Sequence, residues 1–207
     1  MRGSFGRAKD MIEFDMGNLQ APWLLGGIAG SLVIVLAAVL FVHLRKTREK
    51  RRLQKLLQEN VQDVISEVVI PDGLDGFLFA DYLILHHNQV LVMNVKQKHG
   101  YVFGGEKIHE WTCVKNHVTE KFNNPLESVN MFAQAITHNL KFPDVRGYVL
   151  FDSQSDFAKG VPPGVLQLDT FELMLEQSAV EETSEAVQEF WQQLKALTQD
   201  AKANAEH

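Results

Sequence analysis

The sequence predicts an α/β protein with a single N-terminal transmembrane helix and a domain whose central mixed sheet is flanked by helices. Three observations lead to this fold class. Residues 23–44 form a long run without a charged residue. Two runs rich in β-forming residues, 77–85 and 90–96, follow it. Helical patterns then come before and after another short apolar strand, which is typical of a sheet with helices packed on it.

The apolar run Trp23–Leu44 is the strongest single signal. A helix of this length rises about 33 Å, at about 1.5 Å per residue, and a hydrocarbon core is about 30 Å thick. Seven basic residues follow the run within 45–55, whereas three precede it. This asymmetry predicts a single-pass protein of the cell inner membrane, with residues 1–22 outside and the C-terminal domain in the cytoplasm. A cleaved signal peptide is the rival interpretation, but a basic tract stands where a cleavage site would be.

The span and its flank also predict two kinds of contact. Gly26 and Gly30 lie four residues apart, so small side chains share one face of the helix and permit a homodimer. The basic tract Arg45–Lys55 is placed to contact anionic lipid headgroups, although a stop-transfer signal explains it equally.

Charge is divided unevenly along the chain. Residues 1–55 carry a net charge of +6, and residues 56–207 carry −12. A large acidic excess counts against a high-affinity nucleic-acid surface in the domain and favours a basic protein partner. The single cysteine, Cys113, excludes an intramolecular disulfide, as expected in a reducing compartment.

The first part of the domain reads as a helix followed by antiparallel strands. Leucines and valines at helical spacing predict a basic juxtamembrane helix over residues 45–66. Turn residues follow at 71–73 and 75–76, and we place the domain proper at 67–175. The strands 77–85 and 90–96 flank His-His-Asn-Gln, a turn in which adjacent histidines are poor joint metal ligands. A further hairpin is expected around Gly104-Gly105.

The second part reads as helix, strand, helices. Asn124 is a suitable N-cap, with Pro125 in the first turn and Glu127 at the third helical position, for a helix that ends near Leu140. Residues 147–151 form a short buried strand. Helix starts are expected at Asp169 and Ser178, and 176–207 should be an amphipathic helix with a fraying tail after Asp200.

The hairpin geometry brings three polar side chains together. If His87-Asn88 forms a two-residue turn, Asp81 lies opposite Asn94, with Cβ atoms about 5 Å apart. Strand alternation places Lys96 on the same face as Asn94. A carboxylate, an amide and an ammonium on one patch are consistent with metal-dependent phosphodiester hydrolysis. Mg²⁺ takes oxygen ligands and activates water, and a lysine stabilises developing charge.

Several segments in order resemble the NERD (nuclease-related) domain family, which is similar to the PD-(D/E)xK nuclease superfamily. The resemblance covers roughly residues 60–175 and implies a restriction-endonuclease-like domain. The segments that carry it are Asp81-x₁₂-Asn94-Val95-Lys96, His99–Gly105, Trp111, Phe122–Leu126, Val145–Phe151 and Phe157–Val165.

The resemblance implies Asp81 as a metal ligand and Lys96 as the catalytic lysine, with Mg²⁺ or Mn²⁺ as the cofactor of an active enzyme. Asn94 stands where the family has a second carboxylate, so a metal and catalytic role would have to be filled by an amide. The missing charge weakens the attraction for a metal ion. One pair of unit charges at ~4 Å, in an effective dielectric near 20, attracts by about 4 kcal/mol. Ser128 stands where the family has glutamine, and Glu59 or Glu49 would have to supply an additional acid.

Three interpretations remain open from the sequence. The first is a degenerate nuclease fold that serves as a membrane-anchored binding or assembly module, with a protein partner. The second is a divalent-metal-dependent nuclease that hydrolyses DNA or RNA. The third is a structural scaffold, in which the transmembrane segment dimerises and the helix 45–66 extends the pairing. If the site is inactive, Asp81, Asn94 and Lys96 form a cross-strand polar group on a solvated sheet face. The first is our preferred interpretation because the departures remove charge from the site.

Overall fold

The computed structural model describes residues 22–205 except 75, 142–143 and 178–182, and leaves out the side chains of 22–35 and a few residues beyond. Two compact units divide the chain at residues 48 and 49. In the part of the chain so described, no helix is long and apolar enough to cross a membrane. The predicted span Trp23–Leu44 falls largely on residues whose side chains lie outside that description.

The helix α1 runs from Pro22 to Glu59 and supplies the first element of the second unit. The predicted juxtamembrane helix is therefore too long at its C-terminal end, since strand β1 (Asp63–Pro71) begins before residue 66. The β-branched residues of β1 explain the difference because they lose side-chain freedom in a helix and pack well on a sheet. Leu53 and Leu57 of α1 are buried, as the helical spacing predicts.

Five strands form sheet A in the order β1-β2-β3-β7-β9. β2 (Phe77–His86) pairs antiparallel with β1 and β3 (Gln89–Lys96), while β7 (Val145–Phe151) and β9 (Val165–Gln167) continue the sheet parallel to β3. The two-residue turn predicted at His87-Asn88 is confirmed, because His86 pairs with Gln89. Sheet A is therefore mixed, as the sequence predicts.

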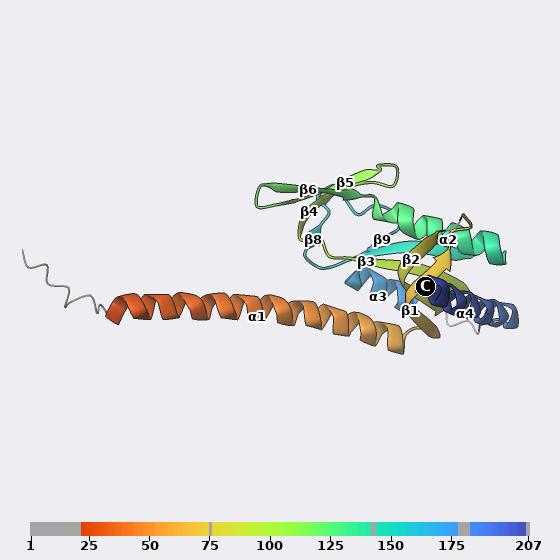
Figure 1. The fold of residues 1–207 in the computed structure, drawn as a ribbon, viewed down its shortest axis with the longest axis horizontal. Coiled ribbons are helices and arrows are strands. Elements are labelled where there is room, and N and C mark those ends of the chain that lie inside the picture. The colour runs from red at the N-terminus through yellow and green to blue at the C-terminus, as the bar shows by residue number, and fades with distance from the viewer. Residues whose placement is uncertain (1–21, 75, 142–143, 178–182, 206–207) are drawn as a thin grey trace, which may run out of the picture. The chain divides into compact units, whose positions relative to one another are not determined.

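Helices cover both faces of sheet A (Figure 1). On one face α2 (Pro125–Leu140) and α4 (Glu185–Ala205) pack over valines and leucines of the sheet. On the other face the end of α1 and α3 (Leu168–Gln177) enclose a second core. The apolar side chains Val187, Phe190, Trp191 and Leu194 of the last helix are buried in this core. Helix α4 begins at Glu185, and the helix start expected at Ser178 lies outside the described residues. The tail does not fray after Asp200 as predicted, because α4 stays helical to Ala205, with Ala201 buried.

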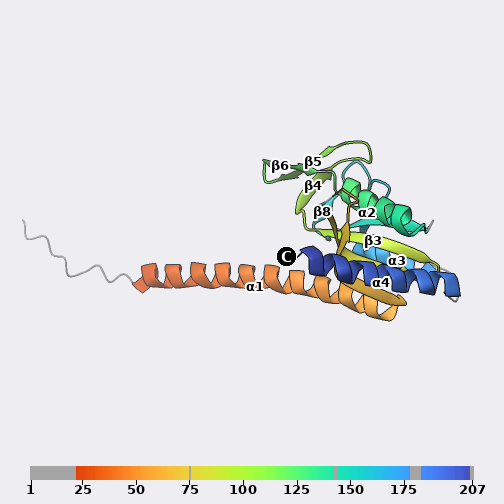
Figure 2. The same cartoon turned by 45° about the vertical axis from the view of Figure 1, so that its right-hand side comes forward.

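Four strands form the smaller sheet B in the order β6-β5-β4-β8, which Figure 2 shows beside the start of α2. They are β4 (Gly100–Phe103), β5 (Glu110–Lys115), β6 (Val118–Asn123) and β8 (Ser155–Asp156). The hairpin expected around Gly104-Gly105 is β4–β5. Strand β6 was not predicted, although its turn has a recognisable cause: Asn116 and His117 both have positive φ, 49° and 65°, as a two-residue hairpin turn requires.

Candidate functional site

Asp81 and Asn94 meet where the ladder between β2 and β3 ends. The last backbone pair of this ladder is Tyr82 with Met93. Beyond it, side-chain oxygens replace backbone carbonyls as acceptors. The amide N of Asp81 donates to Asn94 Oδ1 at 3.0 Å, and the amide N of Val95 donates to Asp81 Oδ2 at 2.6 Å. The predicted juxtaposition of Asp81 and Asn94 is therefore confirmed.

The side-chain amide of Asn94 is engaged at both ends. Its Oδ1 accepts the hydrogen bond from Asp81, and its Nδ2 donates to Ser128 Oγ at 3.3 Å. Asn94 is only 7% exposed, so few other ligands could reach it. Ser128 lies in the first turns of α2, and the amide therefore ties β2, β3 and α2 together at one point. Asn94, which the sequence analysis placed in a candidate catalytic patch, thus connects elements of the fold.

Strand β1 is distorted at the same level. Ser66 pairs with Tyr82 and Val68 pairs with Ala80, whereas Glu67, which lies between them, has a φ of 54°. Such local departures from strand geometry are over-represented next to functional sites. Burial raises the pKa of Tyr82, and the charges of Asp81 and Glu67 add to that effect. The carboxylates of Asp81 and Glu67 therefore both lie near Tyr82 at this level of the sheet.

Lys96 completes the predicted patch at the C-terminal end of β3. It pairs in parallel register with Phe151 of β7 and is half-buried. It lies two residues beyond Asn94, so strand alternation gives the two side chains the same face of the sheet. Asn94 thus contacts both Asp81 and Ser128, and Lys96 lies two residues further along β3.

A second polar cluster, which the sequence did not predict, lies just beyond Lys96. His99 Nε2 is 3.0 Å from Asp152 Oδ2, and Ser155 Oγ donates to Asp152 Oδ1 at 2.9 Å. The same hydroxyl is also within hydrogen-bond distance of the Lys98 carbonyl, so its single proton is shared between the two acceptors. These contacts join the loop after β3 to the loop after β7, where sheet B begins. Residues so far apart in the sequence carry no spacing signal, so the cluster could not be found without the fold.

Comparison with protein families gives one match that spans residues 45–152, just over half of the chain, to the nuclease-related domain (NERD). The chain belongs to the NERD family. Comparison with curated proteins finds no match, and comparison with solved structures finds none. The mixed sheet flanked by helices fits a nuclease-like domain, and the match includes all three residues of the predicted patch.

The additional acid expected of this NERD domain is not brought to the patch. Glu59 lies at the end of α1, which packs on the face of sheet A opposite α2, and it is 3.8 Å from Lys55. Asn94 faces α2 instead, through its bond to Ser128. Glu49, the other candidate, accepts a hydrogen bond from Ser153 Oγ after β7. Glu59 therefore interacts within α1, and Glu49 interacts with the segment that follows β7.

A divalent metal fits these residues poorly. Mg²⁺ takes oxygen ligands, of which one or two are usually carboxylates. Here Asp81 is the carboxylate of the patch, and one of its oxygens already accepts from Val95. The Asn94 oxygen is likewise committed to Asp81. Over the described residues, no group of three or more His, Cys, Asp or Glu side chains is placed to hold a metal ion.

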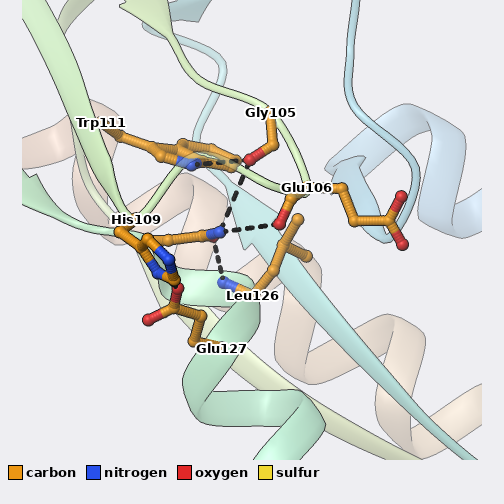
Figure 3. Close-up of polar contacts among 7 residues, drawn as sticks. Gly105, Glu106, His109, Trp111, Leu126 and Glu127 are labelled. Carbon is orange, nitrogen blue, oxygen red and sulfur yellow. Dashed lines mark hydrogen bonds and ion pairs between the residues drawn. The ribbon is translucent and has the colours of Figure 1, made fainter.

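The glycine-tryptophan-asparagine part of the family resemblance has a structural explanation (Figure 3). The Asn124 side chain caps α2 by accepting from the amide N of Leu126 at 3.0 Å. Its Nδ2 donates to the carbonyls of Gly105 and Glu106, and Trp111 Nε1 donates to the Gly105 carbonyl as well. We call Gly105, Glu106, Trp111 and Asn124 the asparagine clamp. It fixes the β4–β5 loop against the start of α2.

Gly104 is required by the same packing. A Cβ on Gly104 would lie 2.1 Å from Cδ2 of Trp111, whose ring is fully buried. A side chain there would displace the ring from the core. These residues therefore have packing and capping roles.

Proposed function

We propose that this protein is a membrane-anchored NERD protein whose nuclease-like fold acts as a binding or assembly module at the cytoplasmic face of the inner membrane, and that it does not cleave nucleic acid. One observation carries the proposal. The Asn94 amide, at the position where the resemblance implies a second carboxylate, accepts a hydrogen bond from Asp81 and donates one to Ser128 while it is only 7% exposed. A buried, uncharged side chain held in this way stabilises the sheet and is a poor ligand for a hydrated Mg²⁺.

Membrane attachment is supported by the sequence. The charge-free run Trp23–Leu44 and the basic tract Arg45–Lys55 together favour insertion with the domain inside. Anionic lipid contact through the tract and pairing through Gly26 and Gly30 are part of the same proposal.

The partner we propose is a basic protein surface. Residues 56–207 carry a net charge of −12, and Asp81 is exposed at the edge of the patch. Nucleic acid would be repelled by that field, because its binding depends on neutralising phosphates with Lys and Arg. Electrostatic complementarity of this kind steers a cationic partner and suppresses wrong ones.

Site-specific photo-crosslinking in membranes tests this function. A benzophenone amino acid at exposed Gln97, beside Lys96, should give a discrete protein adduct, while the same group at exposed Asn139 should not. Asp81→Asn keeps an acceptor for the Val95 amide but removes charge, so the Gln97 adduct should weaken several-fold. Equal adducts at both positions, or an adduct indifferent to Asp81→Asn, would refute a partner at this face.

A further inference from the structure

A buried histidine lies beside the end of α1. His86, the last residue of β2, is 5% exposed. Neither of its ring nitrogens makes a well-formed hydrogen bond in the described chain, although the backbone of Asn60 lies near enough to favour a proton on the ring. Its ring centroid is 4.2 Å from that of His87, the first residue of the turn. A neutral imidazole carries one donor and one acceptor, and here neither is well satisfied.

Among the residues that the structure describes, the elements around His86 offer it no counter-charge. The end of α1 contributes Glu59, which lies 3.8 Å from Lys55. The start of β1 contributes Asp63, which is bound to Trp191 and Lys195 of α4. The loop before α4 contributes the uncharged Thr183 and Ser184, which bind the β2–β3 turn. The titratable group that acts on His86 is His87, and the carbonyl of Asn60 is the one group that favours a proton.

The position of His86 connects it to the docking of α1. Ile84, two residues earlier on the same strand, packs with Leu53 and Leu57 of α1. Strand alternation therefore directs His86 toward the same face, near the Asn60 carbonyl where the helix ends. Any charge that appears on this ring has to be accommodated at the contact between α1 and sheet A.

We propose that His86 is a pH-sensitive lock, which holds the last turns of α1 on sheet A while its ring is neutral and releases them when the ring is protonated. The inference is independent of whether the Asp81–Asn94 patch is catalytic. Burying a charge without a counter-charge costs far more free energy than burying a neutral group. Protonation of the ring therefore favours local opening of this contact.

The sign of the effect follows from linkage. Burial, and then repulsion by His87, lowers the pKa of His86 below its ordinary value of 6.5. The opened state therefore binds more protons than the closed state as pH falls below 6.5. The closed state keeps its full stability above that value and loses it as pH falls toward the lowered pKa. Within this window, each unit by which the pH falls raises the equilibrium constant for opening by about tenfold.

Hydrogen exchange of the full chain in detergent micelles tests the lock. Amides of residues 53–60, corrected for intrinsic exchange rates, should open about tenfold more readily at pH 5.5 than at pH 7.5. His86→Phe should abolish this difference, whereas His117→Asn, a change in an exposed turn, should keep it. An undiminished pH response in His86→Phe would overturn the proposal.

A second measurement covers the case in which His86→Phe does not fold. An NMR titration of the His86 ring in the unchanged chain should give a pKa clearly below 6.5, with the α1 resonances shifting in parallel. A His86 ring that titrates near 6.5, or an α1 end that stays unchanged while the ring titrates, would contradict the lock.

Discussion

At the scale of single residues, two asparagines explain much of the site. Asn94 and Asn124 each join a strand or loop to the start of α2, and both are nearly buried. An amide suits this role because it donates and accepts at once, whereas a carboxylate can only accept. Both amides are therefore used to connect elements of the fold.

The asparagine clamp gives a stability prediction. Asn124→Ala removes a helix cap and leaves the buried amide of Leu126 and two carbonyls with lost hydrogen bonds. A cap alone is worth about 1 kcal/mol and each buried orphan about 1–3 kcal/mol, so the free energy of unfolding should fall by roughly 2–4 kcal/mol. Urea unfolding of the full chain in detergent measures it. Its exposed neighbour Asn123→Ala should lose under ~0.5 kcal/mol; similar losses in both variants would disprove the clamp.

At the scale of elements, the last turns of α1 are part of the domain. Arg52 pairs with Asp169 and Glu172 of α3, and Glu49 accepts a hydrogen bond from Ser153. Each pair is partly exposed and contributes little alone, but Leu53 and Leu57 bury apolar area beside them. The C-terminal end of α1 is thus part of the packed domain.

The topology of α1 can be measured with cysteine labelling. Ser4→Cys should react with a membrane-impermeant maleimide in intact spheroplasts, whereas Ala203→Cys should react only after lysis. The native Cys113 should stay silent because it is buried and burial raises its pKa. Labelling of both introduced cysteines in intact cells, or of neither, would contradict an anchor with its N-terminus outside.

The elements also show what the sequence could predict. The β2–β3 hairpin and α2 were predictable because turn length, N-cap and proline are local signals. The end of α1 was misplaced because Val64 and Ile65 continue a helical spacing by chance but belong to β1. The cluster of His99, Asp152 and Ser155 was beyond prediction, since it depends on two loops that meet only after β3 and β7 pair.

At the scale of the whole molecule, the fold is related to nucleases, whereas the charge is unfavourable for binding nucleic acid. The fold is nuclease-related, and residues 45–152 carry that relationship. Residues 56–207 nevertheless carry a net charge of −12, and Asn94 is an amide at the position where the family resemblance implies a second carboxylate. The two facts agree if the fold was kept for its stability and its exposed face, while the chemistry was given up. Fold alone does not fix function, so the site has to decide.

Nucleic-acid cleavage by the purified full chain tests this conclusion most directly. Labelled single- and double-stranded DNA and RNA would be incubated with Mg²⁺ or Mn²⁺, with Lys96→Ala purified in parallel to account for contaminating nucleases. We predict that both proteins leave every substrate intact, or show the same trace cleavage. Metal-dependent cleavage that is present in the unchanged chain and lost in Lys96→Ala would show an active nuclease and contradict the account.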